Sequence, residues 1–221
     1  NLKRPSFQLL ETMRWRRSEG YALLDYHLKR LARSADYFDF PLDVAEVYRR
    51  LQKAAKQFGG EAYRVRLLVA SNGKMTIDSA RLDLQESTIP RRVCLAPAAV
   101  STTDLFLYHK TTNRSVYERT RASCPGFDDV ILWNERGEIT ESCIANVVVE
   151  LDGERVTPPI SSGVLAGTYR QWLLDESMVR ERVVGREDLQ RCTGLWLVNS
   201  VRGEVEARLE AGLEVVEAVE G

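Results

Sequence analysis

The chain has 221 residues, a hydrophobic content of 44% and a formal net charge of -1. This length and apolar content suffice for one large domain or two modest ones with a buried core. The nearly balanced charge provides no broad basic field, so we expect no nucleic-acid partner. No run of 18 apolar residues and no signal-like start is present, which favours a cytoplasmic protein without a membrane association.

The first half of the chain predicts a strand followed by two helices. Residues 7–13 read as the strand, and apolar residues then recur at helical spacing over 24–38, behind Asp25 as a candidate N-cap. Asp43 and Glu46 form a candidate capping box for a second helix over 44–58.

A hairpin and a linker are predicted next. Residues 63–77 read as two strands around an Asn-Gly turn, and residues 92–96 as another strand. The segment 97–104 is rich in small and turn-forming residues. We therefore expect a smaller α+β domain over 1–98, a linker over 99–104 and a larger domain over 105–221.

The second half predicts hairpins in series between helices. The predicted elements are a helix over 113–121, paired strands over 130–133 and 138–140, paired strands over 147–151 and 154–156, a helix beginning near 168, and a fully buried strand over 195–199. The four cysteines (Cys94, Cys124, Cys143 and Cys192) lie far apart without CxxC spacing, which indicates free thiols and not a metal site.

Lys110 stands out because the chain strongly prefers arginine as its basic residue. Only six of the 31 basic residues are lysines, and Lys110 is the only lysine after residue 74. A guanidinium stays charged, whereas a desolvated amine can lose its proton, attack a carbonyl and act as a base. The alternative is an ordinary surface lysine.

Four motifs occur in a fixed order around this lysine. They are HLKR over 27–30, YHKTTNR over 108–114, ITESCIAN over 139–146 and GVLAGTYR over 163–170. Together they resemble the class IV aminotransferases, which are pyridoxal 5'-phosphate (PLP) enzymes of fold type IV and include branched-chain and D-amino-acid aminotransferases and aminodeoxychorismate lyase. The resemblance implies a two-domain α+β fold, a PLP cofactor and a homodimer.

The resemblance also implies roles for individual residues. Lys110 would hold the cofactor covalently and act as general base and acid, and Glu141 would keep the pyridine nitrogen protonated. Arg114 would lie near the 3-hydroxyl group. Asn146 belongs to the predicted cofactor site, more as a turn or cap residue than as a direct ligand.

The cofactor phosphate needs a concave set of donors. Gly167 would let the backbone amides of Thr168 and Tyr169 approach the phosphate at a helix N-terminus. Arg30 would add a charge-assisted pair and Ser200 a hydroxyl group.

Substrate contacts are less specific in the sequence. Arg64 and Arg66 alternate with apolar residues, so they either clamp a substrate carboxylate or form a solvated strand face. Arg202 is expected near the mouth of the site.

Two segments favour the lyase branch of the family. Residues 7–15 (FQLLETMRW) and 110–114 (KTTNR) resemble the aminodeoxychorismate lyase domain that follows synthase component I in bifunctional proteins. The chain begins at Asn1 and lacks the first hairpin of standalone members, so we expect an excised domain of such a fusion. The implied activity is the release of pyruvate and 4-aminobenzoate for folate synthesis. The alternatives are a branched-chain or D-amino-acid aminotransferase and, from another class, a non-catalytic scaffold.

Overall fold

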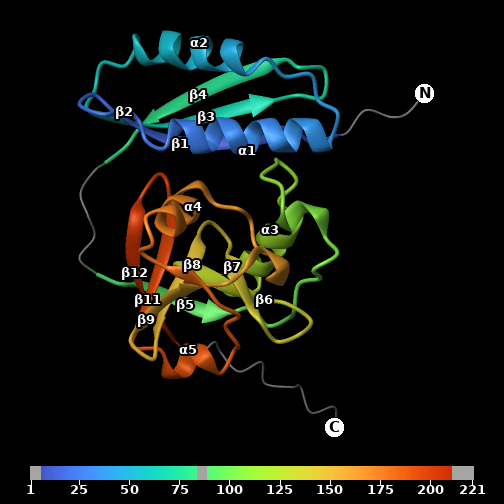
Figure 1. Ribbon diagram of the computed structural model, residues 1–221, viewed down its shortest axis with the longest axis vertical. Coiled ribbons are helices and arrows are strands. Elements are labelled where there is room, and N and C mark those ends of the chain that lie inside the picture. The colour runs from blue at the N-terminus through green and yellow to red at the C-terminus, as the bar shows by residue number, and fades with distance from the viewer. Residues whose placement is uncertain (1–5, 84–88, 211–221) are drawn as a thin grey trace.

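The computed structural model describes residues 6–83 and 89–210 and contains two β-sheets. A four-stranded sheet has the order β2-β1-β3-β4, and an eight-stranded sheet has the order β10-β9-β8-β11-β12-β5-β6-β7. Figure 1 shows the smaller sheet and its helices as one layer above the larger sheet. Strands and helices are mixed in both layers, as the predicted α+β class requires.

The first layer is built from the residues before β5. Its elements are β1 (Leu9–Arg16), β2 (Gly20–Tyr21), α1 (Leu24–Tyr37), α2 (Val44–Ala55), β3 (Ala62–Val69) and β4 (Met75–Arg81). The hairpin of β3 and β4 confirms the predicted one. Val65 and Leu67 pack into the core with the helices, so the alternation of the strand turns Arg64 and Arg66 to the other face.

The two predicted helix caps have different outcomes. Asp25 is not the N-cap of α1, because Leu23 precedes the helix with φ 53 and Asp25 lies in the first turn. A carboxylate is also favourable there, next to the positive end of the helix dipole. Asp43 is confirmed as the N-cap of α2, since its Oδ1 accepts from the Ala45 and Glu46 amides at 2.9 and 3.2 Å. The second half of the predicted capping box is not formed, because the Glu46 carboxylate accepts from Arg50 instead.

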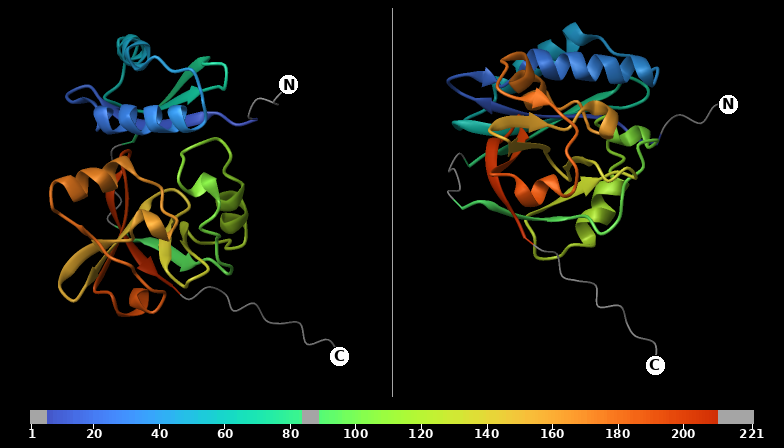
Figure 2. Two further views of the ribbon diagram at one scale, coloured as in Figure 1. Left: turned by 45° about the vertical axis from the view of Figure 1, so that its right-hand side comes forward. Right: turned by 60° about the horizontal axis from the view of Figure 1, so that its bottom comes forward.

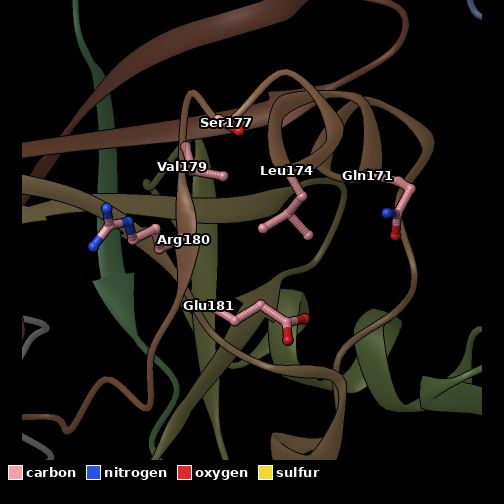
Figure 3. Close-up of a pocket in the computed structure, with 6 residues that line it drawn as sticks. All are labelled: Gln171, Leu174, Ser177, Val179, Arg180 and Glu181. Atoms are coloured by element: carbon pink, nitrogen blue, oxygen red, sulfur yellow. The ribbon is translucent and has the colours of Figure 1, made fainter.

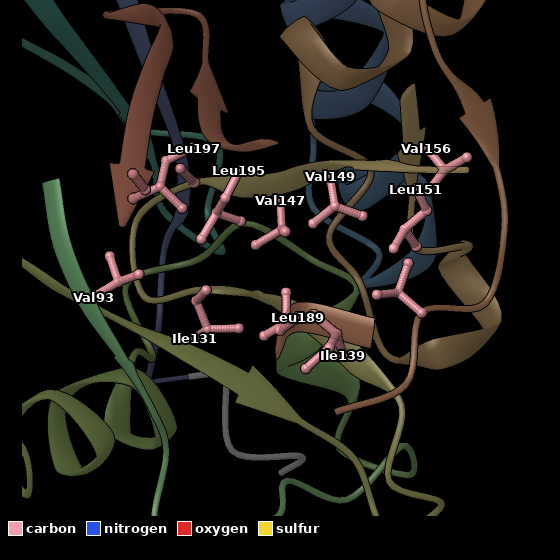
Figure 4. Close-up of a cluster of buried hydrophobic side chains, with 13 residues drawn as sticks. Val93, Ile131, Ile139, Val147, Val149, Leu151, Val156, Leu189, Leu195 and Leu197 are labelled. Carbon is pink, nitrogen blue, oxygen red and sulfur yellow. The ribbon is translucent and has the colours of Figure 1, made fainter. Parts of the chain in front are cut away.

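The second layer contains the remaining elements. They are β5 (Arg91–Leu95), the 3-10 helix η1 (Leu105–Leu107), α3 (Ser115–Ala122), β6 (Asp129–Trp133), β7 (Ile139–Ser142), β8 (Asn146–Leu151), β9 (Glu154–Thr157), the 3-10 helix η2 (Ile160–Ser162), α4 (Thr168–Asp175), β10 (Arg180–Glu181), α5 (Asp188–Arg191), β11 (Gly194–Asn199) and β12 (Gly203–Leu209). Val147 and Val149 of β8 and Leu195 and Leu197 of β11 form much of its core (Figure 4).

The predicted domain boundary is misplaced relative to the sheets. β5 was assigned to the first domain, but it pairs in parallel with β6 and β12 of the larger sheet. Residues 99–104, predicted as a linker, also belong to the second layer, where Val100 forms a bridge with Asn134. The sheets therefore separate between β4 and β5. Residues 1–5, 84–88 and 211–221 of the predicted domains lie outside the described residues.

The strand β11 is less buried than its apolar sequence predicts. Leu195, Leu197 and Val198 are buried, but Trp196 and Asn199 are partly exposed. Leu195 and Leu197 face the core of the larger sheet, and Trp196 packs on the other side with the cluster around α4. In the described part of the chain, no helix is long and apolar enough to cross a membrane.

The larger sheet closes on itself next to the predicted site. Its edge strand β7 also pairs with β8, through Glu141 opposite Asn146. Two of the predicted site residues are therefore held side by side by backbone pairing. The two views in Figure 2 show α1 of the first layer lying over the second layer near α4.

Candidate active site

A cavity of about 730 Å³ lies between the two layers and collects almost every predicted site residue. The predicted residues that line it are Arg30, Arg64, Arg66, Lys110, Arg114, Glu141, Asn146, Gly167, Thr168, Ser200 and Arg202. Tyr169 is the exception. Segments that are far apart in the sequence thus meet at one site, as the order of the motifs predicts.

Backbone bonds to the first layer fix the position of Lys110. Its carbonyl accepts from the Leu10 amide at 3.0 Å, and the next residue, Thr111, forms an antiparallel bridge with Leu9. β1 therefore holds the lysine segment against the cavity. Burial, together with the charges of Arg30 and Arg114, lowers the pKa of Lys110 to about 8. A much larger share of this amine is neutral at pH 7 to 8 than of a solvated lysine.

Glu141 is buried in the cavity wall and held from two sides. The Tyr117 hydroxyl donates to Oε1 at 2.7 Å, and Asn146 Nδ2 donates to Oε2 at 3.2 Å. Burial raises the pKa of Glu141 to about 7, and the hydrogen bond from Tyr117 opposes this rise. A cation placed against this carboxylate would favour its ionised form.

Asn146 connects Glu141 to the loop before α4 through hydrogen bonds. Its Nδ2 also donates to the Leu165 carbonyl at 3.0 Å. A side chain at Gly167 would overlap Asn146 Oδ1, so the glycine is required by its contact with Asn146. The reason predicted for Gly167 was different, namely a close approach of the backbone to a phosphate.

An anion-binding corner lies where α1 meets the N-terminus of α4. The first backbone N–H groups of a helix have no partner within it, and those of Thr168 and Tyr169 begin α4 at this corner. Arg30 reaches the same corner, where its Nη1 donates to the Ala166 carbonyl at 3.2 Å. Ser200 lies at the cavity as well, with Oγ donating to the Thr12 carbonyl at 3.3 Å.

The Tyr169 side chain does not take part in this site. Its ring packs against Trp172, with 5.2 Å between the centroids, and only its backbone amide belongs to the helix N-terminus.

Arg114 does line the cavity. Its guanidinium lies 4.7 Å from the centre of the Tyr117 ring and donates through Nη2 to the Cys143 carbonyl at 2.5 Å.

The rim of the cavity carries arginines without ionic partners. Within residues 6–83 and 89–210, Arg64, Arg66 and Arg202 form no ion pair and donate no side-chain hydrogen bond. Arg81, which the sequence did not suggest, also lines the cavity. This rim is suited to bind carboxylates.

A second hollow, of about 620 Å³, lies at the surface beside α4 and β10 (Figure 3). Its charged groups already have partners, because Glu181 accepts from Arg170 and Arg180 lies 3.4 Å from Glu154. The cavity between the layers is therefore the candidate active site.

Comparisons with known proteins agree with this arrangement. The sequence profile of "Amino-transferase class IV" matches residues 8–209. The chain belongs to the class IV aminotransferase family. This family depends on PLP and has fold type IV, as the motifs predicted.

Three members of the family illustrate its range. The "Putative aminodeoxychorismate lyase" of Schizosaccharomyces pombe is 29% identical over 188 residues, which are 81% of this chain and 80% of the relative. The "Probable branched-chain-amino-acid aminotransferase" of Thermotoga maritima is 27% identical over 82% of this chain and 70% of the relative. The crystal structure of a "Putative amino-acid aminotransferase" from Mesorhizobium loti has a TM-score of 0.87 and 34% identity over 93% of this chain and 100% of that chain.

The cavity of this class IV family member fits a PLP group chemically. It combines one desolvated amine at Lys110, a buried carboxylate at Glu141 and an anion-binding corner at Arg30 and Thr168. These are the donor types that an aldehyde, a pyridine nitrogen and a phosphate each require.

Two residues of this site were missed in the sequence. Tyr117 binds Glu141, and Glu11 holds Arg30 through bonds of 2.9 and 2.5 Å. Tyr117 lies four residues, about one turn, after the start of the helix predicted over 113–121, which follows the lysine segment directly, and this is a usable signal. Glu11 occupies a core position of β1 among Leu9 and Met13, and a carboxylate in such a run is itself the clue.

The lowered pKa of Lys110 predicts how labelling by PLP depends on pH. An amine reacts with an aldehyde only when neutral, so labelling should rise with pH and reach half its maximal rate near pH 8. An ordinary lysine would need a pH of about 10.4. The measurement is borohydride trapping at a series of pH values, followed by peptide mapping. Labelling with a midpoint near pH 10, or at the exposed Lys74, would contradict the assignment.

Proposed function

We propose that the chain is a PLP-dependent lyase that converts 4-amino-4-deoxychorismate into 4-aminobenzoate and pyruvate. The observation that carries this proposal is the arginine rim. The substrate has two carboxylates, and Arg64, Arg66 and Arg202 offer guanidinium groups that have no other partner in the described part of the chain. A branched-chain amino acid would instead place an apolar side chain against these charges. The S. pombe relative, named as an aminodeoxychorismate lyase, supports the same choice.

In this proposal Lys110 carries the proton through the reaction. Its neutral amine removes the proton from the ring carbon that bears the substrate amine. PLP, when bound, supplies the electron sink that makes this carbon acidic. The ring C–O bond to the enolpyruvyl group then breaks, and Lys110 returns the proton to the methylene carbon of the leaving group. Pyruvate leaves with its methyl group complete, and the ring becomes aromatic.

The other site residues hold and orient the reacting groups. Glu141 would face the pyridine nitrogen, with Asn146 and Tyr117 holding the carboxylate in place. Arg114 would lie near the 3-hydroxyl group.

The phosphate would bind at the corner between the layers. Its donors would be Arg30, the amides of Thr168 and Tyr169, and the Ser200 hydroxyl.

The decisive experiment is a product assay of the PLP-loaded protein. One reaction contains aminodeoxychorismate; separate reactions contain branched-chain or D-amino acids with 2-oxoglutarate. We expect pyruvate and 4-aminobenzoate in equal amounts, without conversion of the cofactor to its amine form, because elimination regenerates the aldehyde. Lys110→Ala is the matched negative control. Glutamate from a simple amino acid, with no 4-aminobenzoate, would refute the lyase proposal.

The second candidate is an amino-acid aminotransferase. Its support is the M. loti structure, which is 34% identical and is named as an aminotransferase. Lys110 and Glu141 would serve both reactions, so only the products separate them. A PLP-loaded sample that makes no product at all would favour the scaffold alternative.

The homodimer, the cytoplasmic location and the fusion to synthase component I remain predictions of the family resemblance.

A further inference from the structure

Three buried polar side chains of the first layer form a network behind the anion-binding corner. Glu11, His27 and Arg30 are only 2%, 1% and 6% exposed. Glu11 lies between the other two, accepting from His27 Nδ1 at 2.6 Å and from Arg30 at 2.9 and 2.5 Å. Buried charges of this kind are costly unless every group is paired, so their positions are tightly determined.

The bonds of Arg30 determine which of its donors face the cavity. Nε donates to Glu11 Oε1, Nη2 to Glu11 Oε2, and Nη1 to the Ala166 carbonyl. A guanidinium has five N–H groups, so one remains on each terminal nitrogen. Because the group is planar, the fork with Glu11 fixes the plane in which these two N–H groups lie.

The second arm of the network reaches helix α4. His27 uses Nδ1 toward Glu11, and its Nε2 lies 3.4 Å from the Thr168 hydroxyl. Burial lowers the pKa of His27, which favours the neutral ring, and because Nδ1–H donates to the Glu11 carboxylate, Nε2 of that ring accepts from the Thr168 hydroxyl. Glu11 thus influences Thr168 as well as Arg30. It does not itself line the cavity.

We propose that Glu11 is a positioning residue that orients Arg30 toward the phosphate of the cofactor and, through His27 and the Thr168 hydroxyl, the Thr168 backbone amide as well. The proposal rests on the phosphate site given under Proposed function. Burial acts to raise the pKa of Glu11, but Arg30 and His27 outweigh it and lower the pKa to about 2, so the carboxylate stays ionised. Glu11 therefore has two opposed effects on an anion. It orients the donors, and it also cancels part of their positive charge.

The ratio of the affinities for PLP and for pyridoxal separates these two effects. Pyridoxal has the same aldehyde but lacks the phosphate, so it does not use the corner. We expect Glu11→Gln to weaken PLP binding about tenfold, the scale of one charge-assisted hydrogen bond, and to leave pyridoxal binding unchanged. Glu11→Asp keeps the charge but shortens the reach, so it should weaken PLP binding several-fold. Both affinities are measured by absorbance titration of the apoprotein.

Glu138→Gln is the matched control, because Glu138 is also an ionised, multiply bonded carboxylate. It accepts from Arg136, Asn134 and Ser162, its pKa is lowered to about 2, and it does not line the cavity. Its replacement should leave the ratio unchanged.

Three results would overturn the proposal. Tighter PLP binding by Glu11→Gln would show that charge cancellation dominates. Equal loss for PLP and pyridoxal, which leaves the ratio unchanged, would show a merely structural role, and unchanged affinities for both ligands would show no role. If Glu11→Gln does not fold by circular dichroism, Glu11→Asp decides alone, since it leaves no uncompensated arginine. The ratio does not depend on which products form, so failure of the lyase assignment would leave this result intact.

Discussion

Replacing Lys110 with alanine is expected to abolish turnover while the protein still folds. The change removes the covalent link to the cofactor together with the base that moves the proton. Loss of a general acid–base residue alone costs about 10²- to 10⁴-fold, and loss of the link adds to this. Lys110→Arg should be almost as inactive, because a guanidinium neither forms an imine nor loses its proton. Both variants are compared with the wild type by steady-state rates at saturating PLP.

Lys74→Ala is the control for this experiment. Lys74 is exposed in the turn between β3 and β4 and does not line the cavity. It should retain full activity. A Lys110→Ala protein with a normal circular dichroism spectrum and substantial turnover would exclude Lys110 from the chemistry.

Glu141→Ala and Arg30→Ala are expected to fail in different ways. Glu141→Ala leaves the anion-binding corner in place but removes the carboxylate opposite the ring nitrogen, so turnover should fall by about 10²-fold or more. Arg30→Ala removes a phosphate donor, so the apparent Kd for PLP should rise about tenfold or more, and excess cofactor should restore activity. The measurements are kcat at saturating PLP and the PLP concentration that gives half-maximal activity.

The contrast between these two variants tests which end of the cofactor each residue contacts. If excess PLP rescued Glu141→Ala but not Arg30→Ala, the assignment of Glu141 to the ring nitrogen and of Arg30 to the phosphate would be wrong. Arg136→Ala serves as a control for the loss of an arginine, because Arg136 pairs with Glu138 outside the cavity.

Local patterns predicted the elements of the fold better than their arrangement. Asp43 and the Asn-Gly turn after β3 depend only on neighbouring residues, and both predictions were confirmed in the structure. β5 was assigned to the wrong layer because its partners, β6 and β12, begin 38 and 112 residues after it. Turn-forming residues over 97–104 marked a break in secondary structure, which local composition cannot distinguish from a break between sheets.

The sequence predicted which residues line the candidate site. It did not predict the hydrogen bonds that hold these residues in place. The motifs placed Lys110, Glu141 and Arg30 at one cavity, and they do line it. For Tyr169 the prediction concerned the backbone amide, which lies in the first turn of α4, and its side chain packs against Trp172. Glu11 was missed because a carboxylate on a core strand has no motif of its own. Its partners lie on a helix, and only the fold brings them within hydrogen-bond distance.

The division between the two layers has a consequence for how the substrate specificity of such an enzyme evolves. Every described element before β5 belongs to the first layer, and the elements from β5 onward belong to the second. Lys110 and Glu141 lie in the second layer, whereas Arg64 and Arg66 lie on β3 of the first. Under the proposed function, selectivity and reactivity would therefore be carried largely by separate layers. Mutations in the hairpin of β3 and β4 would then reshape the entrance of the cavity without disturbing Lys110 and Glu141.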